Sequence, residues 1–395
     1  VRSCDTSPLF PSHFPAGASM PLTHTHDELS AWLRLSLEPD LGPSLAYALL
    51  SALGEPAQIY ARRAAELMRH VPQSLALQLA SEPLGEIAEK IETTLRWVEE
   101  PGRHILTLAD PAYPRQLLTI ADPPLLLYVA GEPAQRSKPG LAVVGARSAT
   151  PGGAENARAF SRHLAAQGWS VVSGLALGID GAAHEGALAA GPEGAGTVAV
   201  MGTGIDRIYP AAHRDLAHRI AAHGALISEL PLGTQVRAFN FPRRNRLVAG
   251  LARGVLVVEA AKQSGSLITA RLAAESGREV FAIPGSIHSP LSRGCHALIR
   301  QGAKLVETAQ DITDELGLPT PDARPAPAAR SVQARSPAAP ESPLLHALGH
   351  DPLHLDALQA RTGLDTATLQ AQLLELELAG HVARLDDGRF QRLAS

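Results

Sequence analysis

LAVVGARSATPGGAENAR, residues Leu141–Arg158, has the order of features found where a parallel strand passes into a helix. Four apolar residues come first, then a loop with glycine, hydroxyl residues and one arginine, and then a helical pattern. The backbone N–H groups at a helix N-terminus favour anions. The segment therefore predicts an anion site at the end of a buried strand. Three anions remain open here: a dinucleotide, a small phosphorylated metabolite or a nucleic-acid backbone.

The same alternation of apolar run and helical pattern recurs along the chain. Seven segments are predicted to be strands: Leu141–Val144, Ser170–Ser173, Thr197–Met201, Ala225–Ser228, Gly254–Val258, Glu279–Ile283 and Lys304–Val306. Continuous apolar strands with helical crossovers predict a Rossmann-like α/β fold, in which a mostly parallel, doubly wound sheet is covered on both faces. Ligands of such sheets bind at the carboxyl ends of the strands, and the unusual residues of this sequence lie there.

The composition along the chain predicts five parts. Residues 1–24, rich in Ser, Pro and His, are expected to be disordered. Residues 25–100 are helical, either as a SAM-like or helix-hairpin-helix domain or as a plain small bundle; the shortage of basic residues favours the bundle. Residues 101–316 hold the Rossmann-like domain, which is entered through short strands and turns. Residues 317–343 form an extended Pro/Ala linker, and residues 344–395 form the last domain.

The last domain has the outline of a winged helix. A short helix ends at Thr362-Gly363, and Asp365 can cap the next one. Leu369, Leu373 and Leu376 share one face of that second helix, which Gly380 ends. Two short strands around Asp386-Asp387-Gly388 complete the pattern as a hairpin.

Charge is distributed unevenly along a chain whose net charge is −4. Residues 136–310 carry 19 Lys and Arg against 11 Asp and Glu, whereas residues 341–395 carry 4 against 8. A basic middle favours a polyanionic partner, although an ordinary solvated surface can have the same balance. Because a helix that enters a DNA groove usually brings cations, the acidic winged helix is predicted to be chiefly a protein-interaction or regulatory element.

Several classes of protein are disfavoured by composition. The two cysteines, Cys4 and Cys295, have no partner spacing, and the 16 histidines show no metal-binding pattern. No apolar run approaches the ~18 residues of a membrane span, and no signal segment is recognisable at the start. We therefore expect no disulfide framework, no metal, no membrane association and a cytoplasmic location.

The first strand end concentrates glycine, hydroxyls and a cation. Gly145, Arg147, Ser148 and Thr150, with the amide of Gly152, can surround an anion; the alternative is a buried structural arginine paired with a carboxylate. A dinucleotide site would read G-x-G-x-x-G with an acidic residue ~20 positions later. This loop reads G-x-R-x-x-T, and no acid ends the next strand, so NAD is disfavoured and no cofactor is expected.

The second strand end, SGLALGIDGAAHEGAL, contains Gly174, Gly178, Asp180, His184 and Glu185. These side chains suggest catalysis or a metal, but they are too few for a metal site without ligands from elsewhere. The favoured interpretation is structural: Asp180 caps a helix, and neighbouring backbone satisfies His184.

The remaining strand ends extend the pattern. Gly202, Thr203 and Gly204 form another loop that can present amides, and FNFPRRNR places aromatic rings beside arginines, as a single-strand groove requires. The alternative is a solvated basic face with one buried phenylalanine. Lys262, Ser264, Gly265, Ser266 and Thr269 lie at another helix N-terminus. A single phosphate does not need so many loops on one sheet edge, whereas a polyanion does.

These motifs resemble the DNA-processing protein A family (DprA, also called Smf). The resemblance rests on VGARSAT, VSGLALGIDGAAHEGAL, AVMGTGIDRIYP, SELPLG, FPRRNRLVAGL, VVEAAKQSGSLITA, FAIPGS and LIRQGAKLV, in this order, and is dense from about Ile105 to Ile312. One departure is Ala146, where the family often has serine.

The resemblance implies a non-enzymatic protein that binds single-stranded DNA, dimerises through the Rossmann-like domain and loads the RecA recombinase during natural transformation. It gives Gly145, Arg147, Ser148, Thr150, Arg244, Asn245, Arg246, Lys262, Ser264, Gly265 and Ser266 as DNA contacts. The residue patterns add Gly174, Gly202, Gly204, Phe241 and Arg243 to the predicted DNA-binding set.

Two rival functions remain. Phosphoribohydrolases that act on nucleoside monophosphates share the Rossmann-like sheet, but their Pro-Gly-Gly-x-Gly-Thr loop is followed by a glutamate, which SGSLITA lacks. A transcription regulator would use the C-terminal domain, whose acidity argues against this role.

Overall fold

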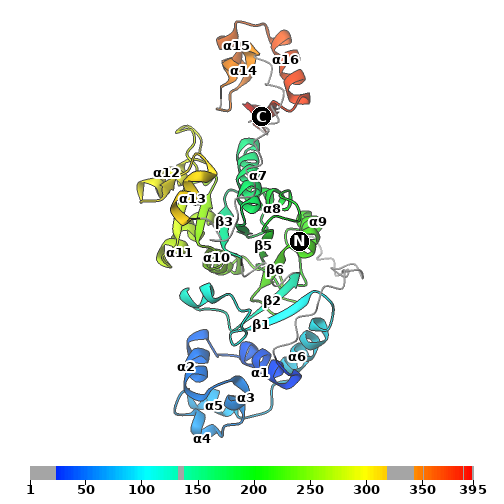
Figure 1. Cartoon of the computed structure of the whole chain (residues 1–395), viewed down its shortest axis with the longest axis vertical. Helices are drawn as coiled ribbons and strands as arrows, with labels where there is room; N and C mark the ends of the chain where they lie inside the picture. The colour runs from blue at the N-terminus through cyan, green and yellow to red at the C-terminus, as the bar shows by residue number, and fades with distance from the viewer. Residues whose placement is uncertain (1–23, 132–137, 318–341, 350, 386, 394–395) are drawn as a thin grey trace.

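The computed structural model describes residues 24–131, 138–317, 342–349, 351–385 and 387–393. Three parts follow one another along its long axis (Figure 1): a group of helices near the N-terminus, a central sheet with helices on both faces, and a small C-terminal unit. The predicted disordered segment 1–24, apart from His24, and most of the predicted linker 317–343 lie outside the described residues, as does Cys4.

The N-terminal helices have their own apolar core. They are α1 (His26–Leu37), α2 (Pro43–Leu53), α3 (Pro56–Tyr60), α4 (Ala64–Leu67), α5 (Gln73–Leu79) and α6 (Gly85–Val98). Thr25 caps α1 in a reciprocal arrangement with Glu28, which satisfies amides that the first turn leaves free. Leu35, Leu49 and Ile59 are fully buried among these helices. Leu29 and Leu33 on another face of α1 pack on the central sheet, as do the buried residues of α6.

The described residues form a central sheet of nine strands. They are β1 (Arg103–Thr107), β2 (Leu126–Gly131), β3 (Gly140–Val144), β4 (Ser170–Ser173), β5 (Thr197–Val200), β6 (Ala225–Ser228), β7 (Gly254–Val257), β8 (Glu279–Ala282) and β9 (Lys304–Leu305). Their order is β1-β2-β6-β5-β4-β3-β7-β8-β9. Among the described strands of this sheet, β2 is antiparallel to both its neighbours, β1 and β6, and the remaining pairs are parallel. This confirms the predicted α/β class, and each of the seven predicted strands agrees with the structure to within one residue at either end.

Helices cover both faces of the sheet because alternate residues of each strand point to opposite sides. From β3, Ala142 and Val144 pack with η1 (Arg115–Thr119), α10 (Asn240–Gly250), α11 (Gly265–Glu275) and α12 (Arg293–Arg300). Leu141 and Val143 pack with α7 (Pro151–Ala166), α8 (Ile179–Leu188) and α13 (Ala309–Leu316). Toward β6 this second face is covered by α9 (Arg214–His223), which η3 (Ala211–His213) precedes.

The C-terminal unit is the predicted winged helix. It consists of α14 (Pro343–Leu348), α15 (Leu355–Thr362), α16 (Thr366–Leu378) and the hairpin of β10 (Val382–Arg384) with β11 (Phe390–Arg392). Asp365 caps α16 by accepting hydrogen bonds from the amides of Ala367 and Thr368, as predicted. Leu369, Leu373 and Leu376 are buried in its core.

Candidate nucleic-acid interface

A cleft of about 500 Å³ lies at the carboxyl ends of β3, β4 and β7. The strand order reverses here: β4, β5 and β6 continue on one side of β3, and β7 and β8 lie on the other. Such a switch point leaves room between the loops for a ligand. Ten of the predicted DNA-binding residues line the cleft: Gly145, Arg147, Ser148, Gly174, Phe241, Arg244, Asn245, Ser264, Gly265 and Ser266.

Arg147 and Phe241 form a cation–ring pair at this cleft. The guanidinium carbon of Arg147 lies 5.8 Å from the centre of the Phe241 ring, and Arg147 is exposed. The ring is seated on Gly202, where a β-carbon would lie 2.7 Å from it, and Tyr209 lies beside it with ring centres 5.5 Å apart. An exposed cation beside a half-buried ring that lines the cleft suits a phosphate and a base of one strand.

The loop that carries Arg147 is held by close backbone packing. Gly178 has φ of 76°, which favours glycine, and a β-carbon there would lie 2.5 Å from the Arg147 carbonyl oxygen. The Ile179 amide donates a 3.1 Å hydrogen bond to the Ala146 carbonyl. Arg147 and Ser148 are therefore presented to solvent by a loop whose backbone is fixed.

The N-terminus of α7 already has an anion, the carboxylate of Glu259. Its two oxygens accept hydrogen bonds from the Thr150 amide, at 2.9 Å, and from the Thr150 hydroxyl, at 2.6 Å. The Thr150 hydroxyl in turn accepts from the Gly153 amide at 3.0 Å. Burial raises the pKa of Glu259, which these hydrogen bonds partly offset. The sequence predicted that Thr150 and this helix N-terminus bind an external anion. In the structure the Glu259 carboxylate of the same chain occupies that position.

Arg244 is buried instead of lying along an open groove. It is 6% exposed, and its Nη1 donates to the carbonyl oxygens of Gly174 and Val200 at the ends of β4 and β5. Burial lowers the pKa of Arg244 to about 10, and the nearby Asp180 carboxylate opposes that shift. A β-carbon at Gly174 would overlap the guanidinium. Arg244 thus connects the ends of β4 and β5 by hydrogen bonds, and it contributes to the cleft as a buried lining residue.

Asp180 and His184 have structural partners. The Asp180 carboxylate accepts from the amides of Gly174, at 3.1 Å, and Ala176, at 3.4 Å, so it binds the preceding loop and does not cap the first turn of α8. His184 is fully buried, and its Nδ1 lies 2.7 Å from the Thr197 hydroxyl, a side-chain partner where backbone was predicted. Its Nε2 is buried without a partner among the described residues.

We expect His184 to make folding sensitive to acid. Burial, aided by His213 and Arg244, lowers the pKa of His184 from 6.5 to about 3. Below about pH 6.5, His184 is protonated in the unfolded chain but stays neutral in the folded chain. The free energy of unfolding therefore falls as the pH falls toward 3. Between about pH 7 and about pH 5.5 this one group should account for about 1 kcal/mol.

Urea unfolding at both pH values measures the effect. His184→Gln should lose less stability on acidification than the parent chain, whereas His163→Gln, which changes an exposed histidine on α7, should behave like the parent. Equal losses for parent and His184→Gln would contradict the assignment.

The three side chains of the predicted Arg-Asn-Arg motif, Arg244, Asn245 and Arg246, face different directions, because successive residues of a helix are rotated by about 100°. Asn245 faces the cleft, where its side chain donates a 3.4 Å hydrogen bond to the Gly265 carbonyl. Arg246 pairs with the buried carboxylate of Glu229 on the other side of α10, and Glu229 also lies 3.5 Å from Arg243. Arg243 is half exposed, at 52%, and stays outside the cleft lining.

The N-terminus of α11 forms the opposite wall of the cleft. Ser264 caps the helix by accepting from the Ser266 amide, and the two hydroxyls lie 2.7 Å apart. Gly265 is exposed, with open space where a β-carbon would project. Lys262 is exposed as well but lines a neighbouring hollow with Arg271 and Arg278.

The loop after β5 is closed, contrary to the prediction that it presents amides to a ligand. Gly202 and Gly204 are buried, the first under the Phe241 ring and the second under the segment from Pro231 to Thr234. The Gly204 amide donates to the Thr234 carbonyl at 3.1 Å. These glycines make room for neighbouring groups and have no open amide face.

Two residues of the site were missed from the sequence. Glu259 follows the apolar run of β7, and the fact that β3 pairs with β7 is what brings it to the α7 N-terminus. Tyr209 is 46% exposed beside Phe241, and its only signal was an aromatic residue within the loop motif IDRIYP.

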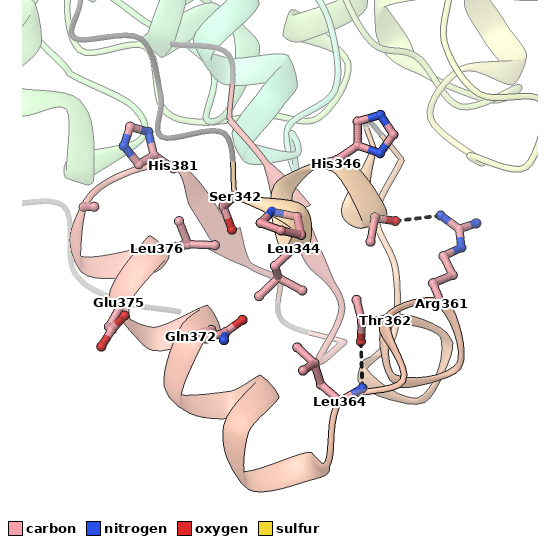
Figure 2. A pocket seen from close by; sticks show the side chains of 13 residues that line it. Ser342, Leu344, His346, Arg361, Thr362, Leu364, Gln372, Glu375, Leu376 and His381 are labelled. Carbon is pink, nitrogen blue, oxygen red and sulfur yellow. Dashed lines mark hydrogen bonds between the residues drawn. The ribbon is translucent and has the colours of Figure 1, made fainter.

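A second hollow, of about 830 Å³, lies within the winged helix (Figure 2). It is bounded by α14, the end of α15 and α16, with Leu344, Leu364 and Leu376 on its wall. None of the predicted DNA-binding residues lines it. This hollow is larger than the strand-end cleft, but its one arginine, Arg361, donates a hydrogen bond to the Ala347 carbonyl, and no Phe, Tyr or Trp side chain lines it.

The described residues contain neither a candidate metal cluster nor a candidate membrane span. No group of three or more His, Cys, Asp or Glu side chains is placed to hold a metal ion in that part of the chain. No helix among the described residues has the length and apolar character needed to cross a bilayer.

Comparison with known proteins matches most of the chain. The sequence model of the family described as DNA recombination-mediator protein A matches residues 104–317, and that of the DprA winged helix domain matches residues 321–388. The chain is 43% identical over 318 residues to Protein Smf of Escherichia coli (strain K12), which covers 80% of this chain and 84% of that protein. It is 46% identical over 209 residues to DNA processing protein DprA of Streptococcus pneumoniae, covering 53% of this chain and 73% of that protein.

One solved structure resembles most of the fold. The X-ray structure of DNA processing protein A (DprA) from Streptococcus pneumoniae superposes with a TM-score of 0.58 at 35% identity. The match covers 74% of this chain and 99% of that chain.

Proposed function

Because this chain belongs to the family of DNA recombination-mediator protein A, the DprA family, we propose that it binds single-stranded DNA at the strand-end cleft and acts in the cytoplasm by binding, without turnover. The observation that carries the proposal is the meeting of three features in one open cleft. These are the exposed Arg147 and Ser148, the Phe241 ring, and the N-terminus of α11. Phosphates can follow the cation and the amides while a base stacks on the ring.

The carboxylates at the cleft support binding over hydrolysis. Asp180 is the one carboxylate among the lining residues, and two backbone amides hold it. Glu259 is occupied by Thr150. Burial raises the pKa of both groups. A phosphoribohydrolase needs an accessible carboxylate at the sugar, and neither group is available in that way.

Fluorescence anisotropy of a labelled oligothymidine tests the proposal. The full chain should bind it with an affinity that falls as salt rises, because bound cations are released from phosphates. A duplex of equal length should bind more weakly, since its bases are not free to stack on Phe241. A chain that ignores single strands but releases base from nucleoside monophosphates would replace this function with the hydrolase alternative.

Recombinase loading is the further step of this proposal. Family membership supports it, and an exposed DNA track on a protein without turnover is what a loading factor requires. On single strands coated with single-strand-binding protein, the chain should shorten the lag of RecA-dependent ATP hydrolysis. If the lag is unchanged while oligothymidine still binds, loading is wrong and DNA binding stands.

A homodimer through the Rossmann-like domain completes the proposal. Edge strand β9 leaves Leu305 47% exposed, and Ile287 in the loop before α12 is 73% exposed. Exposed apolar side chains near an open sheet edge favour association. Light scattering should give the mass of two chains, and Ile287→Glu with Leu305→Glu should give one; a monomeric parent would contradict the dimer.

A further inference from the structure

Helix α16 is apolar on two opposite faces. One face, with Leu369, Leu373 and Leu376, is buried in the winged-helix core. The other carries four exposed residues: Ala367, Ala371, Leu374 and Leu378. Leu374 is 55% and Leu378 81% exposed. A globular domain normally covers one apolar face of a helix and solvates the other, so the second face of α16 has no partner within the described chain.

The spacing of this exposed face is that of a helix-packing seam. Its four members, which we call the outer stripe, are separated by four, three and four residues, the a/d repeat of coiled coils. In Figure 1, α16 lies at the outer edge of the winged helix. The groove in Figure 2 lies on another side of α16, where Gln372 and Leu376 point toward it and Glu375 sits at its edge.

Charge around the outer stripe selects among possible partners. Glu375 and Glu377 are exposed on its two sides, and α16 contains no Lys, Arg or His between Thr366 and Leu378. Duplex DNA is disfavoured because this helix, the third of the winged helix, brings no cation to phosphates. A second copy of α16 is disfavoured because two copies would gather four carboxylates along one short seam.

We propose that the outer stripe docks an amphipathic helix of another protein, with apolar residues at its a and d positions and Lys or Arg at the flanking e and g positions. The apolar residues cover Leu374 and Leu378, and the flanking cations pair with Glu375 and Glu377. None of the four stripe residues lines the strand-end cleft. The winged helix is then the protein-binding domain of a DNA-binding chain.

Two synthetic peptides of three heptads each test this docking. Both have leucine at a and d; one has lysine at every e and g, and the other has glutamate there. Binding of each labelled peptide to the full chain is followed by anisotropy. The lysine peptide should bind at least tenfold more tightly than the glutamate peptide. Glu375→Lys with Glu377→Lys should reverse this preference.

Matched variants separate the stripe from the general acidity of the chain. Leu374→Ser with Leu378→Ser should weaken the lysine peptide at least tenfold. Leu77→Ser with Leu84→Ser removes two leucines of comparable exposure from the N-terminal region and should leave the affinity for the lysine peptide unchanged. Thermal unfolding should be unaffected by either pair, because all four side chains are exposed.

Three results would overturn the proposal. One is equal binding of the two peptides, and another is binding of the lysine peptide that survives loss of Leu374 and Leu378. The third is concentration-dependent self-association or duplex binding that is lost in that same variant, which would assign the stripe to a second copy or to DNA. Oligothymidine affinity, measured on the same proteins, shows whether the cleft function holds regardless of this outcome.

Discussion

Replacing Arg147 with alanine should weaken binding of labelled oligothymidine by about tenfold to a hundredfold and make its salt dependence shallower by about 0.7 in log–log slope. Arg147 is the exposed cation in the cleft lining, and it lies 5.8 Å from the Phe241 ring. If DNA binds as proposed, loss of Arg147 removes a phosphate contact and leaves the Phe241 ring without its neighbouring cation. Anisotropy across a salt series measures both quantities.

Two matched variants identify the origin of the loss. Arg147→Lys keeps the charge but not the planar group over the ring, so it should restore most of the slope and only part of the affinity. Arg96→Ala removes an equal charge from the exposed side of α6 and should change neither quantity. If Arg96→Ala matches Arg147→Ala, the attraction is diffuse and the cleft is not the DNA track.

The fold could be predicted from the sequence because local pattern and tertiary environment agree. Strands such as Leu141–Val144 are apolar along their whole length since helices cover both sides of the sheet. Asp365, the buried leucines and Gly380 likewise mark the limits of α16 through local chemistry alone. The one misassigned cap, Asp180, binds a loop that precedes its helix, and that choice depends on how Gly174 and Ala176 are placed by the sheet.

The site could be predicted only in part, because chain order differs from spatial order at the switch point. From the sequence, Arg147, Arg244 and Arg246 are all predicted DNA contacts. Their burial and their partners, which only the structure shows, distinguish their roles. Arg147 is exposed, whereas Arg244 binds two strand-end carbonyls and Arg246 a buried carboxylate. No acid follows the next strand along the chain; the carboxylate at this site is that of Glu259, which follows β7, the strand paired with β3 on its other side.

Replacing Arg244 with alanine should lower the free energy of unfolding by about 3–5 kcal/mol, because buried acceptors and a nearby buried carboxylate lose a charged donor. Two strand-end carbonyls lose their donor, and the Asp180 carboxylate, buried beside it, loses the nearby positive charge. The space that the guanidinium fills against Gly174 becomes a cavity. Urea unfolding followed by circular dichroism measures the loss, and weaker DNA binding should follow from the disturbed fold.

Arg243→Ala is the matched control, because it removes the same side chain one position earlier on α10. Arg243 is 52% exposed and lies 3.5 Å from Glu229, an arrangement that contributes at most about 1 kcal/mol. A small loss for Arg243 and a large one for Arg244 would show that two adjacent arginines of one motif differ in their contribution because of their burial and their partners. If Arg244→Ala folds as stably as the parent and yet loses oligothymidine, Arg244 contacts the DNA directly and its structural assignment is wrong.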